Sequence, residues 1–251
     1  MAGAPSLVAV RLGLAMTALQ ASIGALNDLV DAPRDAGLKP GKPIPAGIVA
    51  PSAARLAVGL AAAIGLALAA PSGPALIAVA LLVLAAGWTY DLRLKGTPWS
   101  WLPFALGIPL LPVFAWVGAT GGLPAAAVVL LPAAFLAGAA LAIANALPDL
   151  ERDRARGAAT VAVHLGRVRA WRVHLALLVS VAAIALVGLV RLGGTGWGIA
   201  VVAIGLAVAA GGVALLAGGT PERRERGWEL EAVGIALVAA GWLAAAVTGP
   251  A

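Results

Sequence analysis

The sequence AFLAGAALAIANALPDLERD, residues 134–153, joins a long apolar run to a group of charged and polar side chains. Its first part contains only apolar or small residues, as expected of a helix packed in lipid. Its second part contains Asn145, Asp149 and Asp153 at a spacing of four. On an α-helix, residues four apart lie on one face. The stretch therefore predicts a membrane helix that ends in a column of oxygen ligands.

The composition places the whole chain among membrane proteins. Hydrophobic residues make up 62% of the 251 residues, charged residues make up 11%, and the mean hydropathy is +1.00. These values exclude an ordinary soluble domain. A helix needs about 20 apolar residues to cross a bilayer core. We therefore predict an all-α polytopic membrane helical bundle of about eight transmembrane helices, at 5–29, 50–70, 74–90, 98–119, 124–147, 170–190, 196–218 and 228–248.

Charges in the loops predict the orientation of these helices. The loops after the first, third, fifth and seventh spans contain nearly all of the Lys and Arg residues, whereas the loops on the opposite side contain only Arg191. Because cytoplasmic loops carry the Lys and Arg excess, the acidic residues should face the cytoplasm from the cell (inner) membrane. The net charge of +6 then reflects topology and lipid contact and not nucleic-acid binding. The absence of cysteine excludes thiolate chemistry.

The same spacing occurs nearer the N-terminus, in what we call the first acidic set; Asn145, Asp149 and Asp153 form the second acidic set. In NDLVDAPRD, residues 27–35, the side chains of Asn27, Asp31 and Asp35 follow another apolar run. A single set at this spacing usually marks a solvated helix face, but carboxylates at a membrane edge are costly and tend to be functional. Carboxylate and amide oxygens suit Mg²⁺, especially when a phosphate completes its coordination. Two matched sets therefore predict a site for Mg²⁺ and a polyphosphate.

Basic and aromatic residues occur in two segments that Gly and Pro shape, AGLKPGKPIPAG at 36–47 and YDLRLKG at 90–96. Cations opposite metal-binding carboxylates would balance the charge of a diphosphate leaving group. Topology signalling is the competing explanation for each of them, and the surrounding Gly and Pro residues favour Lys42 and Lys95 as contacts. The candidate substrate-binding residues are Lys39, Lys42, Tyr90, Arg93 and Lys95.

Asp91 is a candidate catalytic residue with two possible roles. It could orient an acceptor or take its proton, or it could be a helix-end carboxylate paired with Arg93. We assign no function to His164 or His174, because a lone histidine is usually a surface or core residue.

These motifs together resemble the UbiA superfamily of intramembrane prenyltransferases. NDLVDAPRD is similar to its first aspartate motif, Asn-Asp-x-x-Asp-x-x-x-Asp, and KPIPAG to the basic Pro-x-Pro-x-Gly stretch that follows it. DLERD, residues 149–153, is similar to the second motif, Asp-x-x-x-Asp. YDLRLKG resembles the Tyr and Lys segment after the family's fourth helix. The resemblance covers nearly the whole chain.

The resemblance implies one domain, 1–251, with two pseudo-repeated halves of about 1–119 and 120–251 around a central cavity. It implies Mg²⁺-dependent ionisation of an isoprenyl diphosphate and transfer of the prenyl group to an aromatic or other lipid-precursor acceptor. Lys39, Lys42, Arg93 and Lys95 would contact the diphosphate, and Asp91 and Lys95 would act in catalysis. The metal ligands or their supports would be Asn27, Asp28, Asp31, Asp35, Asn145, Asp149 and Asp153.

Other interpretations remain open. Family members have nine helices with the first motif on the second, whereas here it lies on the first span, so we expect either a further apolar helix upstream or a shortened variant. A terpene cyclase would ionise the same diphosphate and quench the cation internally. A cation- or phosphate-coupled transporter could also contain repeated acidic motifs, although the cations beside them argue against it.

Overall fold

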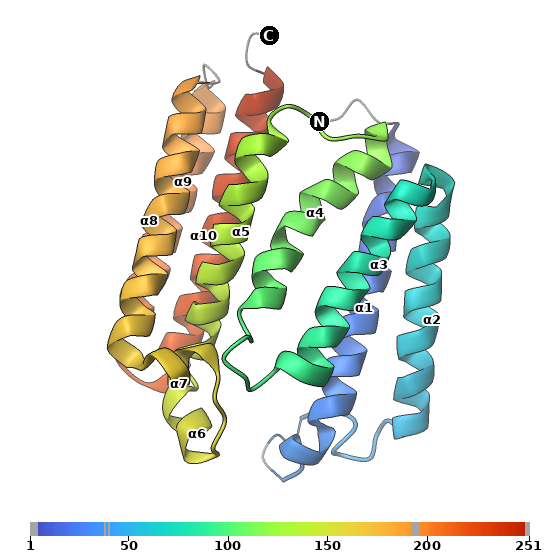
Figure 1. Ribbon diagram of the computed structural model, residues 1–251, viewed down its shortest axis with the longest axis vertical. Coiled ribbons are helices and arrows are strands. Elements are labelled where there is room, and N and C mark those ends of the chain that lie inside the picture. The colour runs from blue at the N-terminus through green and yellow to red at the C-terminus, as the bar shows by residue number, and fades with distance from the viewer. Residues whose placement is uncertain (1–4, 38, 40, 192–195, 249–251) are drawn as a thin grey trace. The chain divides into compact units, whose positions relative to one another are not determined.

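The predicted apolar runs form helices. The computed structural model describes residues 5–37, 39, 41–191 and 196–248, and these contain helices and turns but no strand. Eight of the described helices are long and apolar enough to cross a membrane, which confirms the predicted all-α bundle of about eight spans. The α-helices, shown in Figure 1, are α1 Ser6–Asp35, α2 Pro51–Ala69, α3 Pro74–Thr89, α4 Leu102–Thr120, α5 Ala127–Ala146, α6 Leu150–Ala155, α7 Val161–Leu165, α8 Arg167–Arg191, α9 Gly196–Leu216 and α10 Pro221–Thr248.

Proline and glycine set several helix boundaries. Pro51 and Pro74 stand at the first positions of α2 and α3, where the missing N–H costs nothing because it would have no helical partner. Gly73, before α3, has a φ of 93°, which only glycine adopts without strain. Two helices extend well beyond their predicted boundaries: α1 continues to Asp35 instead of ending near residue 29, and α10 begins at Pro221 instead of near residue 228. The first acidic motif is therefore entirely helical.

The chain divides into two compact units. The N-terminal unit comprises residues 2–95 and 110–124, and the C-terminal unit comprises residues 96–109 and 125–251. In the N-terminal unit, side chains from α1, α3 and α4 such as Leu19, Leu76 and Phe114 form the core. In the C-terminal unit, α5 packs on α8, and the short α6 and α7 follow the end of α5 (Figure 1). The single domain with halves of 1–119 and 120–251 stays a prediction.

Arg11 lies within α1, not in a loop, and forms hydrogen bonds inside the N-terminal unit. Its Nη1 donates to the carbonyl oxygen of Leu68 at 2.6 Å, and its Nη2 donates to Ser72 Oγ at 2.7 Å. Ser72 Oγ in turn donates to Gly118 O at 2.8 Å. A cation at the last carbonyls of a helix is favourable, so Arg11 stabilises the C-terminal end of α2.

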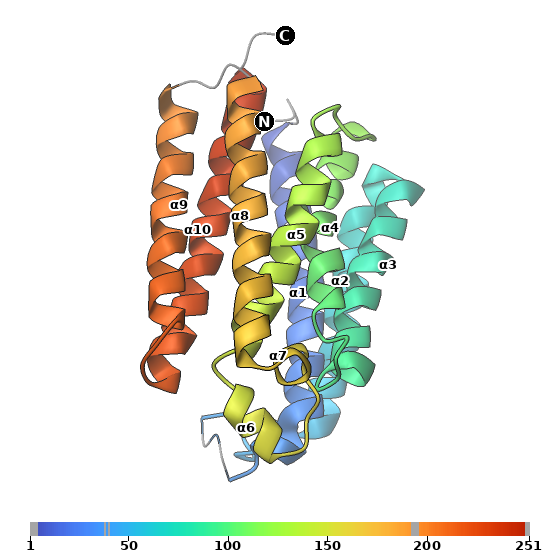
Figure 2. The same cartoon turned by 60° about the vertical axis from the view of Figure 1, so that its left-hand side comes forward.

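Glycines form a seam between α9 and α10, which lie side by side in both views (Figure 2). The facing pairs are Gly198 with Gly241, Gly205 with Gly234, and Gly212 with Gly227. A Cβ at Gly234 would lie 2.4 Å from Ala209 N and 2.7 Å from Gly205 O, both backbone atoms. Small residues let helix backbones approach closely in a membrane. The glycines, spaced seven residues apart on each helix, thus allow α9 and α10 to pack closely.

We expect Gly234→Val to lower the thermal stability of the detergent-solubilised protein, because the added side chain would overlap the backbone of α9. Overpacking of a tight contact typically costs about 1–3 kcal/mol, and a backbone obstacle places this change at the upper end. Gly211→Val is the matched control, since nothing lies within 4 Å of its missing Cβ. Equal melting temperatures for the two variants would contradict the seam.

Candidate functional site

The first acidic set lies in the last turns of α1. Asn27, Asp31 and Asp35 are all within this helix, so their spacing of four places them on one face as predicted. After Asp35 the chain makes turns as far as α2, including hydrogen bonds from Lys39 N to Asp35 O and from Lys42 N to Lys39 O. The Gly- and Pro-containing segment therefore folds back beside the helix end instead of extending it.

The three carboxylates at the end of α1, those of Asp28, Asp31 and Asp35, each contact a lysine that is a candidate substrate-binding residue. Lys42 Nζ donates to Asp28 Oδ1, and this hydrogen bond raises the pKa of Lys42 above its ordinary value. Lys95 Nζ lies 2.5 Å from Asp31 Oδ2, and Lys39 Nζ lies 3.5 Å from Asp35 Oδ1. The two lysines nearest Asp28 and Asp31 are half-buried. Paired in this way, the lysines are held at the acidic face of α1.

A π-helical turn over Tyr90–Leu94 places Lys95. The Lys95 N–H donates to Tyr90 O at 2.8 Å, a bond that spans five residues instead of the four of an α-helix. Lys95 Nζ also lies 5.9 Å from the centre of the Tyr90 ring, within cation–π distance. The segment YDLRLKG thus brings two of its three predicted substrate contacts, Tyr90 and Lys95, to one place. Arg93 lies apart from them, on the exposed side of the turn.

Asp91 pairs with Asn27, so its predicted alternative pairing with Arg93 is wrong. Asn27 Nδ2 donates to Asp91 Oδ1 at 2.7 Å, and Asp91 is only 3% exposed. The π turn directs the carboxylate into the unit and leaves Arg93 in contact with solvent. Because the Asn27 amide nitrogen donates to Asp91, the amide oxygen is left to accept or to bind a cation. Asp91 Oδ2 is buried and has no hydrogen-bond partner among the described residues.

The second acidic set does not form a single helical column, which corrects the prediction. Asn145 lies in α5, which ends at Ala146, and Asp149 precedes α6, which contains Asp153. Pro148 lies in the intervening turn, where its missing N–H and its ring prevent α5 from continuing. Only Asp149 and Asp153 keep the helical relation, through a 2.8 Å hydrogen bond from Asp153 N to Asp149 O. The three side chains therefore belong to two helices.

Arginines surround the second set where lysines surround the first. Arg152 forms an ion pair with Asp149, and Glu151 forms ion pairs with Arg167 and, at 3.5 Å, with Arg224. The hydrogen bond from Arg167 holds the pKa of Glu151 below its ordinary value. Burial raises the pKa of Asp153 above its ordinary value. The loop that follows is fixed by a 2.9 Å bond from Ala159 N to Gly96 O, and Gly96 directly follows Lys95 in the sequence.

Sequence reasoning missed a buried pair inside the C-terminal unit. His174 and Glu231 are both 0% exposed, and His174 Nε2 lies 3.1 Å from Glu231 Oε2. His174 Nδ1 lies 3.1 Å from Ala140 O, and a carbonyl oxygen only accepts, so Nδ1 must carry a proton. Nε2 and Oε2 then need one further proton between them. The intramembrane position of Glu231 was visible in the sequence, but no spacing rule linked it to a histidine on another helix.

The donor chemistry of both sets fits Mg²⁺, although no three His, Asp or Glu side chains within the described ranges are grouped to hold a metal ion. The carboxylates contact lysines and arginines instead. Each set nevertheless provides hard oxygen donors, and the Asn27 amide is oriented by Asp91 in the way that an outer partner orients a metal ligand. Metal binding by these residues stays a prediction.

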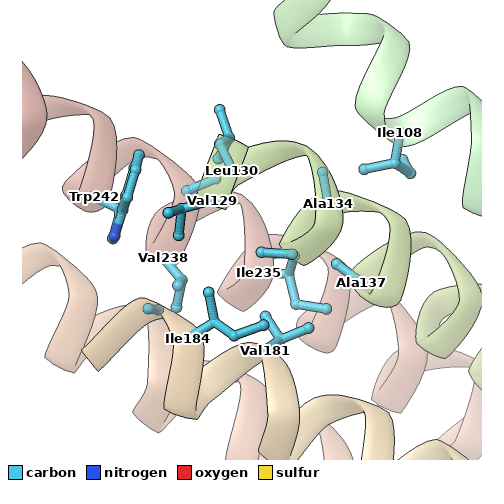
Figure 3. Close-up of a pocket in the computed structure, with 13 residues that line it drawn as sticks. Ile108, Val129, Leu130, Ala134, Ala137, Val181, Ile184, Ile235, Val238 and Trp242 are labelled. Atoms are coloured by element: carbon cyan, nitrogen blue, oxygen red, sulfur yellow. The ribbon is translucent and has the colours of Figure 1, made fainter. Parts of the chain in front are cut away.

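The C-terminal unit also contains an apolar pocket of about 80 Å³ between α4, α5, α8 and α10. Figure 3 shows the aliphatic side chains that line it, with Ile108 and Ala137 toward one end and Trp242 at the other. The indole nitrogen of Trp242 is the one polar side-chain atom in a lining otherwise made of Ala, Val, Leu and Ile. Such a surface suits a hydrocarbon chain.

The fold and the charged sets define a polytopic helical membrane protein with acidic residues opposed by fixed cations at helix ends. A profile of the UbiA prenyltransferase family matches residues 1–233. The chain therefore belongs to the UbiA prenyltransferase family, and it is an integral membrane protein.

Three proteins illustrate this similarity. The digeranylgeranylglyceryl phosphate synthase of Methanopyrus kandleri is 35% identical over 184 residues, which cover 72% of this chain and 66%, just under two thirds, of that protein. An apo structure of a UbiA homolog from Aeropyrum pernix K1 has a TM-score of 0.75 at 20% identity, covering 96% and 91% of the two chains. A UbiA homolog from Archaeoglobus fulgidus bound to DMAPP and Mg²⁺ has a TM-score of 0.71 at 21% identity, covering 97% and 90%. The two structures show the same fold.

Proposed function

We propose that the protein transfers an isoprenyl group from an isoprenyl diphosphate to a lipid-precursor acceptor in a Mg²⁺-dependent reaction. The observation that carries the proposal is the face of α1, where Asp28, Asp31 and Asp35 are each opposed by a lysine. Carboxylates for cations and cations for phosphate are thereby gathered on one surface. The Archaeoglobus fulgidus homolog with DMAPP and Mg²⁺ supports this interpretation.

The two acidic sets have the same proposed task. Asn27, Asp28, Asp31 and Asp35 of the first set, with Asn145, Asp149 and Asp153 of the second, would hold Mg²⁺. When bound, Mg²⁺ neutralises the diphosphate and stabilises it as a leaving group. Both sets would act on one diphosphate, a proposal supported by the matched motifs.

The lysines would exchange partners when the donor binds. Lys42 and Lys95 now neutralise Asp28 and Asp31. With Asp28 and Asp31 holding Mg²⁺, Lys42 and Lys95 would instead donate to the diphosphate oxygens. Each lysine is already held within a few ångströms of the face where charge develops, so little reorganisation is needed. As the bond between C1 and oxygen breaks, the electron pair leaves with pyrophosphate and the allylic cation remains.

The allylic cation must then meet an acceptor and not water. The apolar walls of the spans would exclude water from it. The acceptor's nucleophilic atom forms the new bond to C1 and loses a proton. Asp91 is the proposed proton acceptor, because its Oδ2 is buried without a partner within the described residues while Asn27 fixes its Oδ1. Tyr90 and Arg93 would make further substrate contacts.

Two finer points belong to the same proposal. The 35% identity with a digeranylgeranylglyceryl phosphate synthase favours a lipid precursor over an aromatic ring as the acceptor. The excess of Lys and Arg in alternate loops favours a cytoplasmic orientation of the acidic sets.

Purified protein in lipid nanodiscs tests the function. With Mg²⁺ and geranylgeranyl diphosphate, we expect pyrophosphate release that requires an added acceptor, and a prenylated product by mass spectrometry. Release without any acceptor would indicate cyclisation or hydrolysis. No release from any isoprenyl diphosphate, with any acceptor, would contradict the proposal and favour transport.

We expect Lys42→Met and Lys95→Met each to lower kcat at saturating Mg²⁺, because a metal ion cannot replace a separately placed charge. Loss of one charge-assisted contact to a leaving group should cost about 1.5–3 kcal/mol, or roughly tenfold to more than a hundredfold. Arg55→Met is the control, since Arg55 is a basic, exposed residue at the start of α2 outside the motifs. If all three variants keep wild-type kcat, the lysines serve topology only.

A further inference from the structure

The apolar pocket of the C-terminal unit adjoins another cavity of the same unit. A second cavity lies beyond the first, and the two share three lining residues, Val129, Ile184 and Trp242. The first cavity continues toward Ala137, whereas the second continues toward Arg191. Val129, Ile184 and Trp242 therefore lie between the two cavities. We call these three residues the partition.

Trp242 is the largest member of the partition, and the fold makes room for it. Its side chain is 4% exposed, and its Nε1 has no hydrogen-bond partner among the described residues. The indole packs against Gly188 of α8, where an added Cβ would lie 2.2 Å from Nε1. A buried indole N–H without a partner is unfavourable. The ring is thus held in the partition by the space at Gly188 and not by a polar contact.

The pocket and the second acidic set share α5, which fixes how far apart they lie. Ala137 precedes Asn145 by eight residues and Val129 precedes it by sixteen. At 1.5 Å per residue, the pocket begins about 12 Å and ends about 24 Å along the helix from Asn145. A donor with one isoprene unit would end before the pocket, whereas the distal units of a longer chain would extend into it.

We propose that Trp242 sets the maximum length of the isoprenyl chain by ending the pocket that receives the distal isoprene units of the donor. The inference rests on the proposed function, since it assumes that the diphosphate lies at the acidic sets. The occupant follows from the lining, which is apolar apart from the indole nitrogen of Trp242, and from the position of the pocket on the same helix as Asn145. Trp242 is a specificity-determining residue in this scheme and takes no part in bond breaking.

Donor binding tests the proposal without an acceptor. The probes are the unreactive S-thiolodiphosphates of geranyl, farnesyl, geranylgeranyl and solanesyl chains, titrated with Mg²⁺ into protein in nanodiscs. Wild-type affinity should rise with each isoprene unit and then fall once the chain passes the partition. In Trp242→Ala the two cavities join, and we expect the affinity for the first disfavoured chain, relative to the preceding one, to rise by about tenfold or more, as for a hydrophobic pocket that gains several methylenes of space.

Two further variants make the result specific. Trp197→Ala removes the same side chain from an exposed position on α9 of the same unit and should leave the chain-length profile unchanged. Ala134→Leu fills the pocket ahead of the partition and should shift the preference to shorter chains, so the proposal stays testable if Trp242→Ala does not fold.

The possible outcomes separate the two proposals. If the wild type binds the donors, but neither Trp242→Ala nor Ala134→Leu changes the profile, bilayer lipid fills the pocket and the partition has no role in specificity. If no probe binds the wild type at all, the proposed function itself fails, and this inference fails with it.

Discussion

Asp31→Asn and Asp149→Asn should each reduce pyrophosphate release by about 10²- to 10³-fold, the loss expected when one preorganised electrostatic group is removed from an active site. Each change keeps the size of the side chain but removes a charge from one acidic set. Asp31 is the partner of Lys95, and Asp149 is the partner of Arg152. If both sets hold one diphosphate, the double variant should lose little more than either single variant, because groups that act as a unit are not additive.

The measurement is pyrophosphate release in nanodiscs over a range of Mg²⁺ concentrations, with thermal melting of each variant to establish folding. Glu225→Gln is the control, because Glu225 is an exposed carboxylate outside both motifs. Wild-type turnover in either Asp variant would remove that set from the proposed site. Losses that multiply in the double variant would indicate two independent sites.

The second large effect concerns stability. Glu231→Met or His174→Leu alone should destabilise the folded protein by about 3–5 kcal/mol, because each leaves a buried polar partner without its counterpart. The double variant should recover much of this loss, since an apolar pair of similar volume can replace a buried polar pair. Ala140 O keeps its hydrogen bond within α5, so the loss of His174 Nδ1 does not orphan it.

Thermal unfolding in detergent measures the coupling as a double-mutant cycle. Glu229→Met makes the same substitution two positions earlier on α10, at an exposed site, and should change the melting temperature little. If the two single losses simply add in the double variant, then His174 and Glu231 do not depend on each other.

The sequence predicted those features that a short-range rule determines. Apolar runs of about 20 residues became eight helices, and the spacing of Asn27, Asp31 and Asp35 became one face of α1. The same rule failed for Asn145, Asp149 and Asp153, because α5 ends at Ala146, just before Pro148. A proline alone does not predict this end, since α1 continues through Pro33 to Asp35.

Contacts between helices could not be predicted in the same way. The sequence gives no reason to pair Asn27 with Asp91, or His174 with Glu231, because these partners lie 57 or more positions apart and their distance depends on packing. Arg93 was the predicted alternative partner of Asp91 because it is close in sequence. In the π turn, however, Asp91 is buried and Arg93 is exposed. The glycine seam between α9 and α10 was likewise visible only as a composition rich in Gly.

The π turn makes the position of Lys95 depend on the length of the chain as well as on its side chain. The bond from Lys95 N to Tyr90 O accommodates one residue more than an α-helical turn would. Removing a single residue from this segment would restore α-helical winding, and each residue of an α-helix turns the chain by about 100°. The Lys95 side chain would then leave Asp31, although every charged residue of the site would still be present. The number of residues in this turn is thus part of the motif. A one-residue gap in an alignment at this turn would matter as much as a substitution of Lys95.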